Sequence, residues 1–284
     1  MMSSVVITAT VGEEHLVDAL ASVQDQTWEK TRHLVVVDGP EFEDQVRGAL
    51  RKAPIRRVPV DVMVLPKNTG RNGFFCHRIL AAISFLVDED VILILDSDNT
   101  FDPDHIHKCL KALEWSGLGW CYTLRRMILS DGTYLCDDDA ESLGYWMRYI
   151  AYLAGTGCLS EGEDQFYRQH QHLVDTNCFA VRREVFMRWA SRWHVGPYAD
   201  AVFAKALLEN EPGATTGEVS VSYRLSERNT AKYMLRANEF MRDLFKGRPL
   251  PWRVRGTAPG IIPSRALIGM THYRAGVPTG TSCD

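Results

Sequence analysis

The sequence predicts an α/β protein with a mostly parallel central sheet and helices on both faces. Uninterrupted aliphatic runs over residues 34–37 and 91–95 indicate strands covered on both faces, because a half-exposed strand alternates apolar and polar residues. Helical patterns separate the aliphatic runs along the first third of the chain. Strands that alternate with helices in this way form parallel sheets through right-handed crossovers.

The first part of the chain contains three expected strands. The first strand is expected over residues 5–10. Thr10 and Glu13 then match the T-x-x-E pattern of a capping box, and apolar residues at helical spacing follow them. Strands over 34–37 and 60–65 come next, with a weakly patterned helix between them. These elements form consecutive strand–helix–strand units, whose strands pair in parallel.

A polar loop with two glycines, residues 67–73, leads into the next expected helix. The most apolar strand follows over 91–95. Asp102 is expected to cap the helix after it, because Asp is a preferred N-cap residue and a proline follows at the first helical position. His105 and His107 of that helix lie two residues apart on different faces, and we expect both at the surface.

Length and composition bound the class of protein. The 284 residues suffice for one large domain or two smaller ones with a buried core. A net charge of −4 gives no general electrostatic reason to bind nucleic acid, although a local patch would still allow it. Seven cysteines without a C-x-x-C pair indicate reduced thiols. No signal peptide and no apolar run of roughly 20 residues is evident, so a cytoplasmic location is expected.

Two carboxylates stand where the most apolar strand ends. Asp96 and Asp98 are two residues apart, so in extended geometry they point the same way. Carboxylate oxygens are the ligands that Mg²⁺ and Mn²⁺ prefer. The alternative is a turn in which these polar residues bond their own backbone. In parallel sheets ligands bind beyond the carboxyl ends of the strands, where Asp38 and the 67–73 loop would also arrive.

The order of these motifs resembles a family 2 glycosyltransferase with the GT-A fold. The resemblance covers residues 4–115 well and 175–225 more loosely. Asp38 is followed by Gly39 and Pro40 where many relatives have a second Asp, and the nucleotide loop is shorter than usual. The segments that carry the resemblance are V-V-I-T-A-T (5–10), A-L-A-S-V-Q-D-Q-T (19–27), L-V-V-V-D-G (34–39), N-T-G-R-N-G (68–73), L-D-S-D-N (95–99) and F-D-P-D (101–104).

The resemblance implies a nucleotide-sugar donor, with UDP as the expected nucleotide. A Mn²⁺ or Mg²⁺ ion is expected on Asp98 and Asp96, with His194 or His272 as a further ligand. Such an ion would neutralise charge on the departing diphosphate. The carboxylate of Asp38 suits the imide N–H of uracil. The residues expected to contact the nucleotide are Thr8, Thr10, Asp38, Asn68, Arg71 and Asp96.

A catalytic base is expected in the second half of the chain. Residues 196–207 resemble the family's "g.gEDtdLa.RL" segment, with Asp200 at the position of the base and Ala199 in place of the usual acidic neighbour. Asp200 would begin an apolar helix, whose dipole would help to keep it ionised. A helix cap without a catalytic role is the alternative. Arg224 in a late strand is expected to face the diphosphate.

The remaining expectations concern the domains and the acceptor. We expect one GT-A domain over residues 1–245, with a nucleotide-binding half (1–115) and an acceptor half (116–245), and a basic Pro- and Gly-rich tail or lid over 246–284. The acceptor is expected to be a hydroxyl of a glycan, a lipid-linked molecule or a protein, and a nucleic acid stays open. An aromatic cluster forms either an acceptor wall or a helix core: Tyr145, Trp146, Tyr149 and Tyr152.

The resemblance therefore implies a metal-dependent glycosyltransferase that acts with inversion. Single additions are expected, because the family's processive signature Q-x-x-R-W is absent and no membrane helix is evident. Retaining enzymes share the fold, so stereochemistry rests on the resemblance. A nucleotidyltransferase is one alternative, but it would normally place a G-x-G-T-R-like loop where this chain has T-V-G-E at 10–13. A non-catalytic nucleotide-sugar-binding protein is the other.

Overall fold

The computed structural model describes residues 1–138, 174–225, 235, 239 and 260–262. Its strands are β1 (Ser4–Thr10), β2 (Thr31–Val37), β3 (Val60–Val64), β4 (Val91–Ile94), β5 (Thr100–Phe101), β6 (Trp120–Ile128), β7 (Tyr134–Asp137), β8 (Phe179–Arg182), β9 (Gly213–Arg224) and β10 (Gly260–Ile262). Its helices are α1 (Leu16–Gln24), α2 (Glu43–Lys52), α3 (His77–Ile83), α4 (His105–Ser116), α7 (Arg183–Trp189) and α8 (Ala199–Asn210), with short 3₁₀ turns η1 (Pro40–Phe42), η3 (Thr176–Cys178) and η4 (Ala190–His194).

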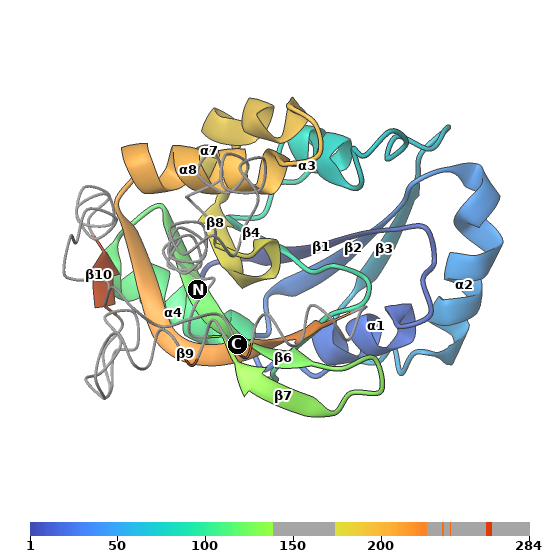
Figure 1. The fold of residues 1–284 in the computed structure, drawn as a ribbon, viewed down its shortest axis with the longest axis horizontal. Helices are drawn as coiled ribbons and strands as arrows, with labels where there is room; N and C mark the ends of the chain where they lie inside the picture. The colour runs from blue at the N-terminus through green and yellow to red at the C-terminus, as the bar shows by residue number, and fades with distance from the viewer. Residues whose placement is uncertain (139–173, 226–234, 236–238, 240–259, 263–284) are drawn as a thin grey trace, which may run out of the picture.

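One mixed sheet organises the described residues, in the order β10-β9-β6-β8-β4-β1-β2-β3. Strands β3, β2, β1 and β4 pair in parallel, as predicted. Strand β8 is antiparallel to both β4 and β6, whereas β6 and β9 are parallel. Figure 1 shows α3, α7 and α8 on one side of the sheet and α1, α2 and α4 on the other. The predicted α/β class, with helices on both faces, is confirmed.

Burial on both faces explains the aliphatic strands. In β2, Leu34 and Val36 join the larger apolar cluster, whereas Val35 and Val37 pack in a second cluster with α1 and α2. Alternate residues of a strand point to opposite faces, so this division means that both faces are covered. Strand β4 lies at the centre, between β1 and β8, and its four residues are buried. The strand order therefore reverses at β1 and β4, where open α/β sheets bind ligands.

The predicted capping box at the start of α1 is wrong. Helix α1 begins at Leu16 after His15, so Thr10 at the end of β1 and Glu13 in the following turn both lie before it. The two side chains do meet, because Thr10 Oγ1 donates to Glu13 Oε2 at 2.6 Å. The T-x-x-E pattern therefore marks a side-chain bond in the turn after β1.

The expected cap and surface histidine of α4 are also wrong. Helix α4 begins at His105, after Asp104. Both carboxylate oxygens of Asp102 accept from the guanidinium of Arg126 on β6, each at 2.7 Å. His105 is fully buried and stacks on Phe101 with ring centroids 3.8 Å apart, whereas His107 is exposed as expected. Neighbouring strands supply these partners, so helical spacing alone does not predict them.

Several expectations lie outside the described residues. They are the aromatic cluster at 145–152, His272, and most of the 246–284 segment. Within that segment, β10 pairs antiparallel with β9, so residues 260–262 belong to the sheet. Among the described residues, no helix combines the length and apolar character needed to cross a bilayer.

A buried histidine on β2 predicts how stability responds to acid. His33 Nε2 lies 2.9 Å from Thr8 Oγ1, and burial lowers the pKa of His33 to about 3. The unfolded chain, with a pKa of about 6.5, takes up the proton first. The stability that depends on neutral His33 is therefore fully present above about pH 6.5. It is lost as the pH falls toward the pKa of the folded state, and the loss is about 2 kcal/mol at pH 5.

We expect His33→Asn to reduce the drop in the free energy of unfolding between pH 7.5 and pH 5 by about 2 kcal/mol, measured by urea titration. The variant loses stability at both pH values, so the comparison uses the difference between them. His107→Asn at an exposed position is the control and should keep the wild-type pH dependence. Equal pH dependence in His33→Asn and wild type would contradict the assignment.

Candidate active site

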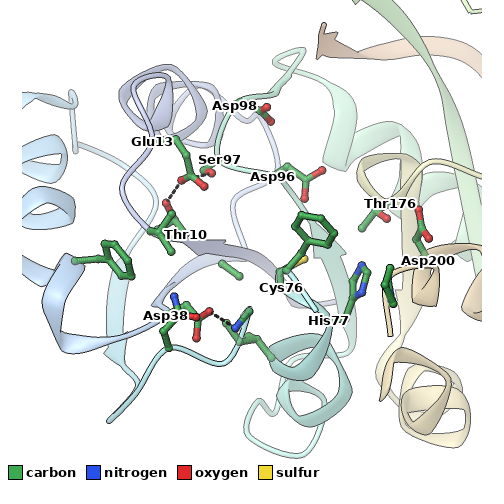
Figure 2. Close-up of a pocket in the computed structure, with 18 of the residues that line it drawn as sticks. Thr10, Glu13, Asp38, Cys76, His77, Asp96, Ser97, Asp98, Thr176 and Asp200 are labelled. Carbon is green, nitrogen blue, oxygen red and sulfur yellow. Dashed lines mark hydrogen bonds between the residues drawn. The ribbon is translucent and has the colours of Figure 1, made fainter. Parts of the chain in front are cut away.

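A cavity of about 780 Å³ opens beyond the carboxyl ends of β1 and β4. Figure 2 shows Asp38 and Thr10 at one end, His77 and Asp200 at the other, and Asp96 between them. The volume lies in the usual range for small-molecule and cofactor sites. The cavity therefore brings together side chains from both halves of the chain at the switch point of the sheet.

Asp38 fixes the glycine loop at the first end. Its Oδ1 accepts from the backbone N–H and the hydroxyl of Thr69, at 2.7 and 2.8 Å, and its Oδ2 accepts from the N–H of Gly70 at 2.8 Å. Gly70 has no room for a side chain, because an added Cβ would lie 2.6 Å from the carbonyl oxygen of Phe75. The carboxylate thus holds the loop closed beside the cavity, which Asp38 also lines.

The turn after β1 is tied to the loop after β4. Glu13 Oε2 accepts from Thr10 Oγ1 and from Ser97 Oγ, both at 2.6 Å (Figure 2). Thr10 lines the cavity, as expected for a residue near the nucleotide. Thr8 was expected to do so as well, but it is fully buried, bonded to His33, and does not line the cavity.

Asp96 is held by a polar network from the second half of the chain. Asn177 Nδ2 donates to Asp96 Oδ2 at 2.8 Å and to Asp175 Oδ1 at 2.9 Å, and Asn177 Oδ1 accepts from the backbone N–H of Asp96. Asp175 also accepts from Arg125, whose Nε lies 3.0 Å from a carboxylate oxygen of the fully buried Asp138. The network spans the loop after β4, strand β6 and the segment before β8, so it joins the first and second parts of the chain.

Burial and like charge shape the electrostatics of the acidic pair. Burial, followed by the charge of Asp175, raises the pKa of Asp96 to about 7. Burial also raises the pKa of Asp98, and the charge of Glu13 adds to this effect. Carboxylates crowded in this way are stabilised by a nearby cation, and oxygen ligands suit Mg²⁺ and Mn²⁺. Asp96 and Asp98 therefore fit the divalent ion that the sequence predicted.

The expected further metal ligand does not reach this pair. His194 is exposed at the end of η4, with its ring centroid 6.0 Å from that of Phe74, and it does not line the cavity. Within the part of the chain that the structure describes, no group of three or more His, Cys, Asp or Glu side chains is placed to hold a metal ion.

Asp200 lines the far end of the cavity, in the first turn of α8, as predicted. Its Oδ1 accepts from the N–H of Ala201 at 2.7 Å. Burial nevertheless raises the pKa of Asp200 above its usual range, because desolvation outweighs this hydrogen bond and the opposing charge of His77. The expected effect of the helix dipole, to favour the ionised form, is therefore not the dominant one.

The other residues predicted to contact the donor lie in the cavity wall, at its rim or behind the loop that carries Asp98. Asn68 lines the wall, and its Oδ1 is buried without a hydrogen-bond partner among the described residues. Arg71 stands at the rim with its side chain 75% exposed. Arg224 was expected to face the diphosphate, but its Nε donates to the carbonyl oxygen of Asp98 at 3.1 Å and its backbone N–H to Asn99 Oδ1 at 2.8 Å. Arg224 therefore supports the loop that carries Asp98.

Sequence reasoning missed three residues of this cavity or its support. Phe75 lines the cavity with 65% of its surface exposed and φ of 45°, an unusual value for a side chain of this size. His77 and Asn177 are buried, and they contact Gly196 and Asp96. Phe75 and His77 directly follow the glycine loop, which was the available signal. Asn177 gave none, because its partner lies 81 residues away.

The mixed α/β sheet and its cavity with strand-end carboxylates define the GT-A class of fold. A family model confirms this class at the level of sequence: the model for glycosyl transferase family 2 matches residues 4–189. The chain belongs to glycosyl transferase family 2. No curated protein matches the chain.

Solved structures share the fold at low sequence identity. The crystal structure of S. aureus TarS 1-349 in complex with UDP-GlcNAc superposes with a TM-score of 0.52 and 13% identity, covering 82% of this chain and 61% of that one. The crystal structure of S. aureus TarS 1-349 in complex with UDP superposes with a TM-score of 0.52 and 14% identity, covering 82% of this chain and 63% of that one. This chain thus spans about three-fifths of the length of TarS 1-349.

The hydrogen bonds that Asp38 accepts from Thr69 and Gly70 yield a prediction for the 67–73 loop. Asp38→Asn keeps one acceptor oxygen and would turn an NH2 donor toward the N–H of either Thr69 or Gly70, leaving a buried donor unsatisfied. We expect the free energy of unfolding to fall by about 1–3 kcal/mol, with faster amide hydrogen exchange at residues 69 and 70. Asp61→Asn removes a carboxylate from an exposed ion pair with Arg32 and should cost less than about 1 kcal/mol. Unchanged exchange in Asp38→Asn would show that the carboxylate does not hold the loop.

Proposed function

We propose that this glycosyltransferase moves a sugar from a UDP-linked donor, such as a hexose or N-acetylhexosamine nucleotide, to a hydroxyl acceptor with inversion. One observation carries the proposal: a single cavity contains Asp38 with its loop, the Asp96–Asp98 pair and the partly buried Asp200. Membership in family 2 supports the reaction class. The ligands in the titles of the TarS structures, UDP and UDP-GlcNAc, support the choice of donor.

The donor nucleotide is proposed to lie at the Asp38 end. A carboxylate accepts well from the imide N–H of uracil, and the amide of Asn68 adds hydrogen-bonding capacity in the same wall. Arg71 at the rim offers a planar set of donors to the diphosphate. The exposed ring of Phe75 gives a sugar ring an apolar face to pack on. These contacts would place the anomeric carbon between the acidic pair and Asp200.

Asp98 and Asp96 would hold Mn²⁺ or Mg²⁺, because both are partly buried carboxylates whose pKa values are raised by burial and by neighbouring acidic groups. When bound, the ion supplies positive charge to the departing nucleoside diphosphate. Asn177 keeps one oxygen of Asp96 in place, and Arg224 keeps the backbone of Asp98 in place. These bonds restrain the carboxylate of Asp96 and the backbone that carries Asp98.

Asp200 is proposed as the general base. An attacking hydroxyl must lose its proton as it forms the new bond, and a carboxylate within hydrogen-bonding reach can accept it. The hydrogen bond from Ala201 fixes the rotation of the carboxylate. Burial raises the pKa of Asp200, which makes it a stronger base than an exposed carboxylate. No observation favours the nucleotidyltransferase alternative, and substitution of Asp200 distinguishes catalysis from simple donor binding.

Donor and metal binding are tested together by thermal shift. We expect UDP with Mn²⁺ to raise the melting temperature more than either alone, because ligands that bind the folded state stabilise it. Asp98→Ala should remove the part of the shift in melting temperature that depends on Mn²⁺. Glu114→Ala, which removes an exposed carboxylate on α4, should respond like wild type. If UDP and GDP both fail to stabilise the wild-type protein with Mn²⁺, the proposed donor site is wrong.

The role of Asp200 is tested by the rate of donor turnover. We expect Asp200→Asn to lower UDP release from UDP-N-acetylglucosamine by at least about 100-fold while the thermal shift with UDP is retained. Since the base must be ionised and its pKa is raised, the wild-type rate should fall with decreasing pH at values above the usual carboxylate pKa of about 3.9. Undiminished turnover in Asp200→Asn would rule out this base.

A further inference from the structure

His77 is a buried histidine in the cavity wall that the chemistry above leaves without a role. It begins α3 and is 7% exposed. It lines the same cavity as Asp200, and Figure 2 shows both side chains at the same end of that cavity. A polar ring in this position needs a structural or chemical reason, because burying an unpaired polar group is costly.

Its hydrogen bond fixes which ring nitrogen of His77 carries the proton. Nδ1 lies 2.8 Å from the carbonyl oxygen of Gly196, and a carbonyl oxygen only accepts. Nδ1 is therefore the donor, and in the neutral ring Nε2 is the unprotonated nitrogen. The δ nitrogen thus connects α3 to the loop that precedes α8.

That carbonyl belongs to the start of the helix that carries Asp200. Gly196 O also accepts from the N–H of Ala199, the first residue of α8, at 3.3 Å. Gly196 has φ of 112°, in the left-handed region that favours glycine. A loop with this backbone freedom depends on its contacts for a single conformation. The bond from His77 therefore restrains the turn immediately before Asp200.

Packing holds the imidazole in the orientation that this bond requires. The ring of His77 lies against that of the fully buried Trp193, with centroids 5.8 Å apart. Trp193 in turn stacks on Phe203 of α8, with centroids 4.7 Å apart. The same contacts that hold His77 therefore also hold the body of α8.

We propose that His77 is the positioning residue of Asp200: its Nδ1–H holds the Gly196 carbonyl and so fixes the first turn of α8 that presents the carboxylate to the cavity. The inference rests on the proposed role of Asp200 as base. A displacement of about 1 Å in a reacting group is enough to lower a rate about 100-fold. His77 acts through Asp200 and does not itself take the proton.

Three substitutions separate the two ring nitrogens. His77→Asn keeps an N–H donor at the δ position, His77→Gln places its amide near the ε position, and His77→Leu removes both. The assay follows UDP release from UDP-N-acetylglucosamine with Mn²⁺. We expect kcat within about 3-fold of wild type for the Asn variant and about 10- to 100-fold lower for the Gln and Leu variants, with KM for the donor unchanged.

A second readout does not depend on turnover. Amide hydrogen exchange over residues 197–203 should be faster in His77→Leu and His77→Gln than in wild type and close to wild type in His77→Asn. His105→Leu is the matched control: it removes another buried histidine, bonded to Ser220 and away from the cavity, and should keep wild-type kcat and exchange in α8. Urea unfolding of each variant confirms that it is folded.

The outcomes separate this inference from the proposed function. Three outcomes would each overturn the positioning role: wild-type kcat in all three His77 variants, the same loss of kcat in all three, or a change in KM alone. If wild type shows no turnover with any nucleotide sugar, the proposed function fails, and the exchange pattern still tests the bond to Gly196. His77→Leu in the Asp200→Asn background should cause no further loss of kcat, because no base is left to position.

Discussion

The structure depends on holding several carboxylates together at the carboxyl edge of the sheet. Asp96, Asp98, Asp175 and Asp200 lie around one cavity, where burial and mutual repulsion raise the pKa of Asp96, Asp98 and Asp200. Such an arrangement persists only where hydrogen bonds and positive charge compensate. Arg125 supplies the charge by pairing with Asp175 and Asp138, which raise its own pKa. Asn177 supplies hydrogen bonds, because its Nδ2 donates to both Asp96 and Asp175.

The mixed sheet makes this compensation possible. The parallel strands β1, β2 and β4 bring Thr10, Asp38 and Asp96 to one edge, as such strands do in open α/β sheets. Strand β8 then pairs antiparallel with β4, so the segment that precedes β8 returns to the same edge with Asp175 and Asn177. Segments from the first and second parts of the chain therefore meet within the sheet, and the cavity is formed where they meet.

Local patterns found the groups that carry the proposed chemistry. Asp38, Asp96 and Asp98 were predicted because they stand at strand ends, positions that hydrophobic periodicity reveals, whereas Asp200 was found through the resemblance of residues 196–207 to a family segment. The same kind of reasoning failed for Asp102, where a pattern typical of a helix cap belongs to an ion pair with another strand. Helical spacing likewise placed His105 at the surface, although β9 covers it. Short polar motifs have several uses, and the partner that decides among them is remote in sequence.

The sequence by itself determined the α/β class, the parallel half of the sheet, the family and the acidic side chains, because these depend on the pattern of neighbouring residues. Only the tertiary structure decided that Asn177 and Arg125 support Asp96, that Arg224 supports the loop of Asp98, and that His77 contacts the turn before Asp200. It also decided the direction of the pKa shifts, since burial depends on the whole fold. The physical reason is the range of the interactions. Secondary structure follows local periodicity, whereas burial and hydrogen-bond partners depend on chain segments up to 206 residues apart.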